Sequence, residues 1–235
     1  RSALRARGVA SVYLSDRDSV FASDEAADLC LWLQGVAMPQ DLRAVRAALG
    51  NSLNIPAVKT LAQTGLDPFY HTLQRLGFSS LRQLPDWYGY SLALGSADVS
   101  LAMLANAYRA LANGGVWSPL HLEPQSVPPP VGSTSKSAEA SERRRALSEP
   151  VSFIVSDILS DRRARVLTFG MESWLGTPYW TAVKTGTSKD MRDNWAVGYS
   201  QHYTVGVWVG NASGAPMWDV SGTTGARSEE HTSEL

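Results

Sequence analysis

Two short motifs hold the residues of this chain that could do chemistry. Lys184–Ser188 (KTGTS) combines a cation, hydroxyl groups and a glycine in an extended setting. Ser52–Asn54 (SLN), far upstream, carries a hydroxyl and an amide close together. A serine hydroxyl attacks an acyl donor only when a base removes its proton and hydrogen-bond donors stabilise the developing oxyanion. Together, the two motifs indicate acyl transfer by a serine-type active site.

Each motif also has a purely structural interpretation. Ser52 and Asn54 could cap a helix that begins near Pro56. Lys184–Gly186 could be an ordinary strand end with a bulge glycine. The chemical interpretation therefore rests on the joint occurrence of the motifs, in order and with suitable elements around them.

The elements that must position these motifs change class along the chain. Apolar stripes predict helices first, and runs of β-branched and aromatic residues predict strands later. The predicted helices cover 41–49, 57–63, 67–76, 101–111 and 150–159, and the predicted strands cover 180–184, 195–200 and 203–209. Because Gln201 and His202 form a very tight connection, the last two strands should pair as an antiparallel hairpin. Helices followed by antiparallel strands indicate an α+β fold.

The same patterns give expectations for single residues. Ser100 should be the N-cap of the helix over 101–111. Residues 88–95 should be irregular or form a short extended piece. Three aromatic residues of the strands should belong to the core rather than to a substrate surface: Trp195, Tyr199 and Trp208. The inward stripe of the helix over 150–159 should consist of Val151, Ile154, Val155 and Ile158.

Three stretches do not read as parts of a folded domain. Residues 124–148, rich in Pro and Ser at their start, predict a flexible loop. Residues 1–38 lack sustained periodicity, and we interpret them as a truncated or mis-framed start. Residues 227–235 resemble the translation of a widely used sequencing-library adapter, the alternative being a natural acidic tail. The domain itself is therefore expected over 39–226.

Composition excludes several classes of function. With 235 residues and a net charge of −1, the chain has no global electrostatic case for binding nucleic acid. Cys30 is the single cysteine, so no intrachain disulfide is possible. No run of apolar residues reaches the length of a membrane span. The histidines are scattered and give no ligand pair, so no metal site is predicted from His71, His121, His202 and His231.

Four motifs, in this order, resemble the transpeptidase domain of class A penicillin-binding proteins, most of all the bifunctional 1C group. They are Gly50–Val58, Ala107–Gly115, Lys184–Ser188 and Arg192–Tyr199. The resemblance implies a β-lactamase/transpeptidase-like α+β fold, with an antiparallel sheet flanked by helices and an N-terminal truncation. It also implies a D,D-transpeptidase that cross-links peptidoglycan stem peptides and binds β-lactams, with no metal or organic cofactor.

The resemblance also assigns catalytic roles. Ser52 would relay a proton toward the leaving amine. Asn54 would bind the substrate peptide and hold the lysine of the nucleophile motif. Lys184 would place positive charge beside Ser52 and attract the terminal carboxylate of the donor.

Three further residues are expected to bind substrate. The hydroxyls of Thr185 and Thr187 would bind the donor carboxylate. Gly186 would keep the strand flat, so that a substrate backbone could lie alongside it. The backbone N–H of Thr187 would form half of the oxyanion hole, and losing such a donor costs about 3 kcal/mol.

The nucleophile itself, a Ser-x-x-Lys that should precede Ser52, is not found in usable form. The Ser133–Lys136 copy has the wrong order and lies in the predicted loop. Ser2–Arg5 ends in an arginine, which stays protonated and cannot act as a base. We therefore expect a fragment that is inactive alone. Its parent would carry an upstream glycosyltransferase module and an anchor, and would act at the periplasmic face of the inner membrane.

Two other functions remain open at this point. A β-lactam-binding sensor, or a degenerate interaction module with the same fold, would also lack a working nucleophile. A β-lactamase is less favoured, because no clear deacylating carboxylate lies near Ser52–Asn54.

Overall fold

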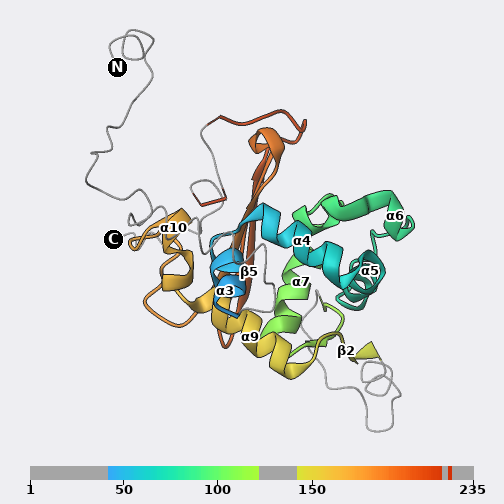
Figure 1. Ribbon diagram of the computed structural model, residues 1–235, viewed down its shortest axis with the longest axis horizontal. Coiled ribbons are helices and arrows are strands. Elements are labelled where there is room, and N and C mark those ends of the chain that lie inside the picture. The colour runs from blue at the N-terminus through green and yellow to red at the C-terminus, as the bar shows by residue number, and fades with distance from the viewer. Residues whose placement is uncertain (1–41, 122–141, 219–221, 224–235) are drawn as a thin grey trace, which may run out of the picture.

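The computed structural model describes residues 42–121, 142–218 and 222–223 (Figure 1). The unassigned start, the Ser133–Lys136 motif and the tail over 227–235 lie outside the described residues. Most of the loop predicted over 124–148 also lies outside them. Within the described ranges, no helix is long and apolar enough to span a bilayer.

The first half of the described chain is helical, as predicted. Its elements are α3 (Leu42–Gly50), α4 (Asn54–Thr64), α5 (Leu66–Arg75), α6 (Pro85–Tyr88), the 3₁₀ helix η2 (Gly89–Leu94) and α7 (Leu101–Ala112). Ser100 caps α7, because its Oγ accepts a hydrogen bond from the Met103 N–H at 3.2 Å. The prediction that residues 88–95 form a short extended piece was wrong, because most of them lie in the 3₁₀ helix η2. Pro85 at the start of α6 begins a helical turn that ends at Gly89, where φ is +59°, and the 3₁₀ helix η2 follows directly.

The second half contains helix α9 (Glu149–Ser160), the short helices η3 (Arg163–Arg165) and α10 (Val166–Phe169), and the main sheet. Its strands are β3 (Ala182–Thr187), β4 (Asp193–Tyr199) and β5 (Thr204–Gly210), with η4 (Lys189–Met191) between the first two. The order β3-β4-β5 is antiparallel throughout, so the predicted hairpin of the last two strands is confirmed. β3 begins later than expected and runs through the whole KTGT segment.

The predicted loop over 124–148 extends too far at its C-terminal end. β2 (Arg144–Arg145) pairs with β1 (Val116–Trp117), and the Arg144 guanidinium lies 3.7 Å from the centre of the Trp117 ring. The Ala146 and Leu147 N–H groups both donate to the Gly115 carbonyl. This stretch is therefore fixed against the end of α7.

Two hydrophobic clusters hold the helices and the sheet. One joins α4, α5, η2 and α7 through Leu61, Tyr70, Phe78, Leu81, Tyr88, Leu92 and Ala107. The other joins helices to the sheet, with Leu159, Ala182 and Tyr199 at its centre and Leu49, Tyr108, Leu111 and Val155 packed around them. Leu49, near the end of α3, is thus packed beside the strand that carries Lys184.

The buried stripe of α9 is turned relative to the prediction. Val151 is 46% exposed and Ile154 is 42% exposed, whereas Ser152 is buried. The small Ser152 side chain allows a close approach, because a Cβ at Gly115 would lie 2.8 Å from its Oγ. The contact face of α9 therefore runs along Ser152, Val155, Ile158 and Leu159, so the predicted stripe is right for Val155 and Ile158 and wrong for Val151 and Ile154.

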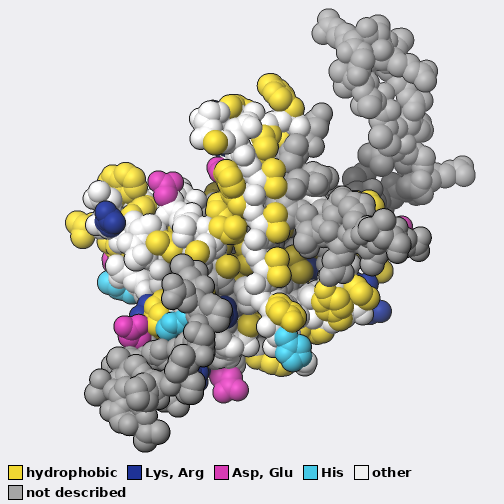
Figure 2. All heavy atoms as spheres, turned by 180° about the vertical axis from the view of Figure 1, so that it is seen from behind, with side chains coloured by type: hydrophobic (Ala, Val, Ile, Leu, Met, Phe, Trp, Pro, Cys, Tyr) yellow, Lys and Arg dark blue, Asp and Glu magenta, His cyan; other side chains and the backbone are white. Residues whose placement is uncertain are grey.

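Helix α7 covers the face of the sheet that bears Lys184. A Cβ at Gly206 would lie 2.9 Å from the Leu101 side chain of α7. Lys184 pairs with Val197, and Val197 pairs with Gly206, so the three residues share one face. Seen from behind, hydrophobic side chains also gather along the sheet at the surface (Figure 2), where Tyr203 and Val205 are exposed.

The aromatic strand residues divide between core and surface. Tyr199 is 3% exposed, as predicted. The core assignment of Trp208 was wrong, because this side chain is 39% exposed and its indole N–H donates to the Asp193 carboxylate at 3.0 Å. Trp195 is intermediate in burial.

Candidate active site

Ser52 lies in a tight turn between α3 and α4 and has an unusual backbone. Its φ is +58°, in the left-handed region that few residues other than glycine adopt. The Ser52 N–H donates to the Leu49 carbonyl at 3.1 Å. α4 begins at Asn54 with Leu53 as its N-cap, and no side chain caps it. The alternative that Ser52 and Asn54 merely cap a helix is therefore wrong.

Ser52 and Lys184 meet although 132 residues separate them. Lys184 Nζ donates to Ser52 Oγ at 2.6 Å and to the carbonyl of Thr185 at 2.6 Å. Burial lowers the pKa of Lys184 from 10.5 to about 8. At pH 7 the amine is therefore mostly protonated, yet it can lose its proton at small cost.

The protonation of Lys184 sets the direction of the hydrogen bond with Ser52. An ammonium group only donates, so Ser52 Oγ must accept and its own hydrogen points elsewhere. A neutral Lys184 could instead take a proton from Ser52. The pair can thus pass a proton in either direction, which is the chemistry that a departing amine or an attacking hydroxyl needs.

Among the described strands, β3 lies at an edge of the sheet. The Thr185 carbonyl accepts from the Lys184 side chain. Because backbone groups alternate in direction along a strand, the N–H of Thr187 lies on the same side as that of Thr185. Among the described residues, a Cβ at Gly186 would meet the Cβ of Trp195 alone, at 3.9 Å. Neither the packing of these residues nor the backbone conformation therefore requires glycine at this position.

The two threonine side chains lie on the face of β3 opposite Lys184. Thr185 is buried, and Thr187 Oγ1 accepts a hydrogen bond from the Gly222 N–H at 2.9 Å. Gly222 lies close above the strand, since a Cβ there would be 2.7 Å from the Gly186 carbonyl oxygen. Among the described residues, the threonine hydroxyls make no hydrogen bond to the Ser52–Lys184 pair.

Asn54 is exposed at the first position of α4. Within the described part of the chain, its side chain is not hydrogen-bonded to Ser52 or Lys184. The structure thus brings together Ser52 and Lys184, places Thr185, Gly186 and Thr187 along the neighbouring strand, and leaves Asn54 facing outward.

Two residues next to the site were not predicted from the sequence. Asn51 is 3% exposed and binds the backbone of η3 and α10. Gly222 contacts Thr187 as described above. A polar residue between two helices was the only sequence signal for Asn51, and Gly222 had none. The described residues contain no group of three or more histidine, cysteine or acidic side chains that could hold a metal ion.

An α+β fold in which a Lys-Thr-Gly edge strand meets a Ser-x-Asn turn defines the class of penicillin-recognising transpeptidase folds. The comparison with family models agrees with this class. The chain belongs to the family described as the penicillin binding protein transpeptidase domain, whose model matches residues 32–224.

Characterised relatives are class A proteins. The chain is 32% identical over 170 residues to penicillin-binding protein 1C of Escherichia coli K12, covering 72% of this chain and 20% of that protein. It is 31% identical over 168 residues to penicillin-binding protein 1A of Aquifex aeolicus, covering 71% and 22%. The chain thus spans about a fifth of the length of these relatives.

Solved structures share the fold. Penicillin-binding protein 1A of Haemophilus influenzae matches with a TM-score of 0.54 at 21% identity, over 76% of this chain and 32% of that one. An imipenem acyl-enzyme complex of penicillin-binding protein A from M. tuberculosis matches with a TM-score of 0.54 at 18% identity, over 77% and 44%. The predicted α+β transpeptidase-like fold is confirmed.

Proposed function

We propose that the chain is the D,D-transpeptidase module of a peptidoglycan synthase, which binds stem peptides and β-lactams. The observation that carries the proposal is the 2.6 Å contact between Lys184 Nζ and Ser52 Oγ beside an edge strand. An exposed strand edge can pair with an extended peptide, and a nearby ammonium can bind the terminal carboxylate of that peptide.

Each residue contributes one step in this proposal. Lys184 attracts the carboxylate and holds Ser52 Oγ as an acceptor. The hydroxyl of Ser52 donates its hydrogen to the amine that leaves when the donor amide bond breaks, and the Lys184 ammonium returns a proton to Ser52 Oγ. The Thr187 N–H binds the oxyanion and Gly186 leaves room for the peptide backbone. The hydroxyls of Thr185 and Thr187 help to bind the carboxylate, which they would have to reach across the edge of β3, and Thr187 would first have to release the Gly222 N–H.

Asn54 and the acylated serine complete the proposal. Asn54, exposed beside Ser52, binds the substrate peptide and the lysine of the nucleophile motif. The serine that forms the acyl bond would come from outside the described residues, since they contain no Ser-x-x-Lys. In the parent protein, an anchor would hold the module at the periplasmic face of the bacterial inner membrane.

Two measurements on the 235-residue chain test this function. The first is the binding of doubly acetylated lysyl-D-alanyl-D-alanine, followed by NMR. We expect signals of β3 residues and of Ser52 to shift, and Lys184→Met to abolish the shifts. A folded chain whose spectrum does not change at millimolar peptide would contradict the proposal.

The second measurement is the intact mass of the folded chain after incubation with a penicillin. We expect no stable adduct, because the described residues contain no Ser-x-x-Lys that could form the acyl bond. A single stable adduct would overturn that part of the proposal, and peptide mapping would then test Ser2 against Ser133. Peptide binding without acylation, if it persisted in the full-length parent, would instead favour a β-lactam-binding sensor.

A further inference from the structure

Asn51 uses every hydrogen-bonding group of its side chain. Its Nδ2 donates to the carbonyls of Ala47 at 2.9 Å and Ala164 at 2.8 Å. Its Oδ1 accepts from the Thr168 N–H at 3.0 Å. Buried amides with full hydrogen bonding are strongly fixed, because losing one partner leaves a buried polar atom unsatisfied. One side chain thus joins the end of α3 to both η3 and α10.

A second contact holds the peptide bond that joins Asn51 to Ser52. The Thr168 hydroxyl donates to the backbone carbonyl of Asn51 at 2.9 Å. The N–H of the same peptide unit belongs to Ser52 and donates to Leu49. Both ends of this planar unit are held, and the N–H of the next unit, which belongs to Leu53, donates to the Ala48 carbonyl at 2.9 Å. Because the planar units on both sides of the Ser52 Cα are held, φ of Ser52 is restrained.

This restraint acts on the residue with the unusual backbone conformation, Ser52. Ser52 has φ of +58°, and a residue other than glycine stays in that region only when its surroundings hold it there. In this conformation its Oγ lies 2.6 Å from Lys184 Nζ. A change of φ at Ser52 would swing the hydroxyl away from the lysine.

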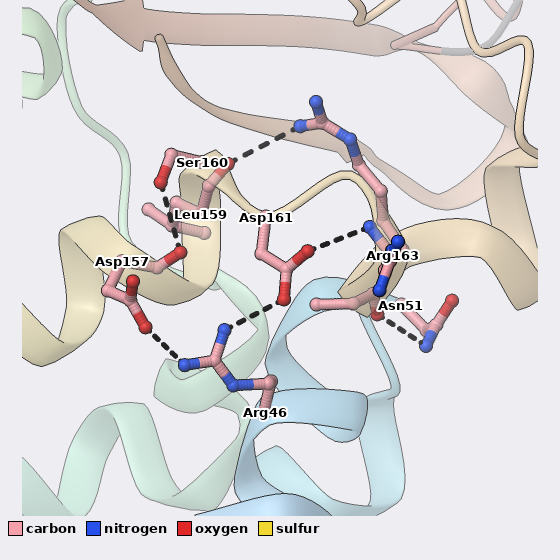
Figure 3. A network of polar contacts seen from close by, with 9 residues as sticks. Arg46, Asn51, Asp157, Leu159, Ser160, Asp161 and Arg163 are labelled. Carbon is pink, nitrogen blue, oxygen red and sulfur yellow. Dashed lines mark hydrogen bonds and ion pairs between the residues drawn. The ribbon is translucent and has the colours of Figure 1, made fainter. Parts of the chain in front are cut away.

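The elements that anchor the restraint are themselves fixed to α3 (Figure 3). Arg46 of α3 lies between Asp157 and Asp161, and donates to Asp161 Oδ2 at 2.8 Å. Asp161 Oδ1 also accepts from the Arg163 N–H at 2.9 Å. Gly50 lies directly against η3, because a Cβ there would be 2.3 Å from the Ala164 carbonyl oxygen. The segment that carries Thr168 therefore cannot move independently of the turn at Ser52.

We propose that Asn51 and Thr168 form a positioning pair that keeps the Ser52 hydroxyl on Lys184. The inference rests on the proposed function, in which Ser52 and Lys184 pass a proton. Neither residue of the pair touches substrate. They act through the backbone of Ser52, so α10 becomes part of the active-site machinery although it lies outside the sheet and its motifs.

The test compares Lys184 in the folded chain and in four variants. Thr168→Val removes the hydroxyl and keeps the shape, and Asn51→Leu removes the whole amide without adding a charge near Lys184. Thr168→Ser retains the hydroxyl. Thr64→Val is the matched control, because the Thr64 hydroxyl bonds to carbonyls of its own helix, α4. For each protein, a pH titration of the lysine side-chain carbons by NMR gives the pKa of Lys184, and thermal unfolding gives the stability.

The positioning role predicts which variants change Lys184. In Thr168→Val and Asn51→Leu, the pKa of Lys184 should rise from about 8 toward 10.5, because water reaches the amine once the Ser52 hydroxyl has moved away. Thr168→Ser and Thr64→Val should titrate as the unmodified chain does. If Thr168→Val and Asn51→Leu lower the melting temperature and leave the Lys184 titration unchanged, their role is structural only and the inference is overturned.

This outcome is independent of the proposed function. The Lys184 titration needs neither substrate nor a serine that forms an acyl bond. A chain that fails to bind the acetylated peptide, yet shows the predicted change in Thr168→Val, would contradict the transpeptidase proposal and support the positioning pair. A chain that binds the acetylated peptide but shows no change of the Lys184 titration in Thr168→Val would retain the transpeptidase proposal and exclude a positioning role for Asn51 and Thr168.

Discussion

Raising the pH above 8 should release a carboxylate ligand from the candidate site. Burial lowers the pKa of Lys184 to about 8, so the ammonium that attracts the carboxylate is lost in a range where exposed lysines stay charged. With a pKa of about 8, the protonated fraction is about 90% at pH 7 and about 10% at pH 9. If only the protonated form binds, affinity falls about ninefold, or about 1.3 kcal/mol, across this interval.

Doubly acetylated lysyl-D-alanyl-D-alanine is a suitable probe, because the terminal carboxylate is its only charge and does not titrate above pH 6. Its dissociation constant would be measured by NMR titration from about pH 6.5 to 9.5, in steps of half a pH unit. This range lies within about two pH units of the pKa of Lys184. Lys184→Arg stays charged throughout and should give a flat profile. Lys184→Met should bind weakly at every pH.

Two results would refute this reasoning. One is a wild-type affinity that stays constant from pH 7 to 9. The other is an equal loss of affinity in Lys184→Arg, which would show that another group controls binding. Circular dichroism at each pH would verify that the chain remains folded.

Three further predictions concern stability. Because folding lowers the pKa of Lys184, the unfolded state binds more protons between pH 8 and 10.5, so stability should rise with pH in this window. Between pH 8 and 10.5, the free energy of unfolding measured with denaturant should rise by about 1–3 kcal/mol more in the unmodified chain than in Lys184→Met. Equal pH profiles of the two proteins would contradict this prediction. Ser52→Gly should be about 1 kcal/mol more stable than Ser52→Ala, because glycine adopts positive φ without strain, and equal midpoints would argue against the left-handed turn. Gly50→Ala should destabilise the protein by about 1–3 kcal/mol, because the added methyl group clashes with Ala164. Thermal unfolding measures this loss, and an unchanged melting temperature would contradict the close contact of Gly50 with η3.

Local patterns predicted most of the fold. Helices such as α7, with its Ser100 cap, and the β4–β5 hairpin follow from residues close together in sequence. The errors also have local causes. The inward face of α9 is set by the small Ser152, which apolar periodicity does not favour, and β2 forms because Arg144 covers Trp117.

The motif residues of the site could be predicted from the sequence, whereas the contacts that hold the turn at Ser52 could not. Ser52 and Lys184 stood out through their resemblance to known motifs, and the structure places them in contact. The contacts of Asn51 with Ala164 and Thr168 join common residue types across more than a hundred positions, so no local pattern reveals them. The left-handed backbone of Ser52 was equally hidden, because serine has no special preference for it.

The distance in sequence between Ser52 and Lys184 has a consequence for the order of folding. The cluster around Leu61, Tyr70 and Tyr88 lies between them and uses contacts that are near in sequence, so it can form early. The Ser52–Lys184 contact closes a loop of 132 residues and must come late, after the strands have been synthesised and paired. We therefore expect changes at Ser52 to accelerate unfolding and to leave the folding rate nearly unaltered. During synthesis, this site would remain unformed until almost the entire domain had left the ribosome.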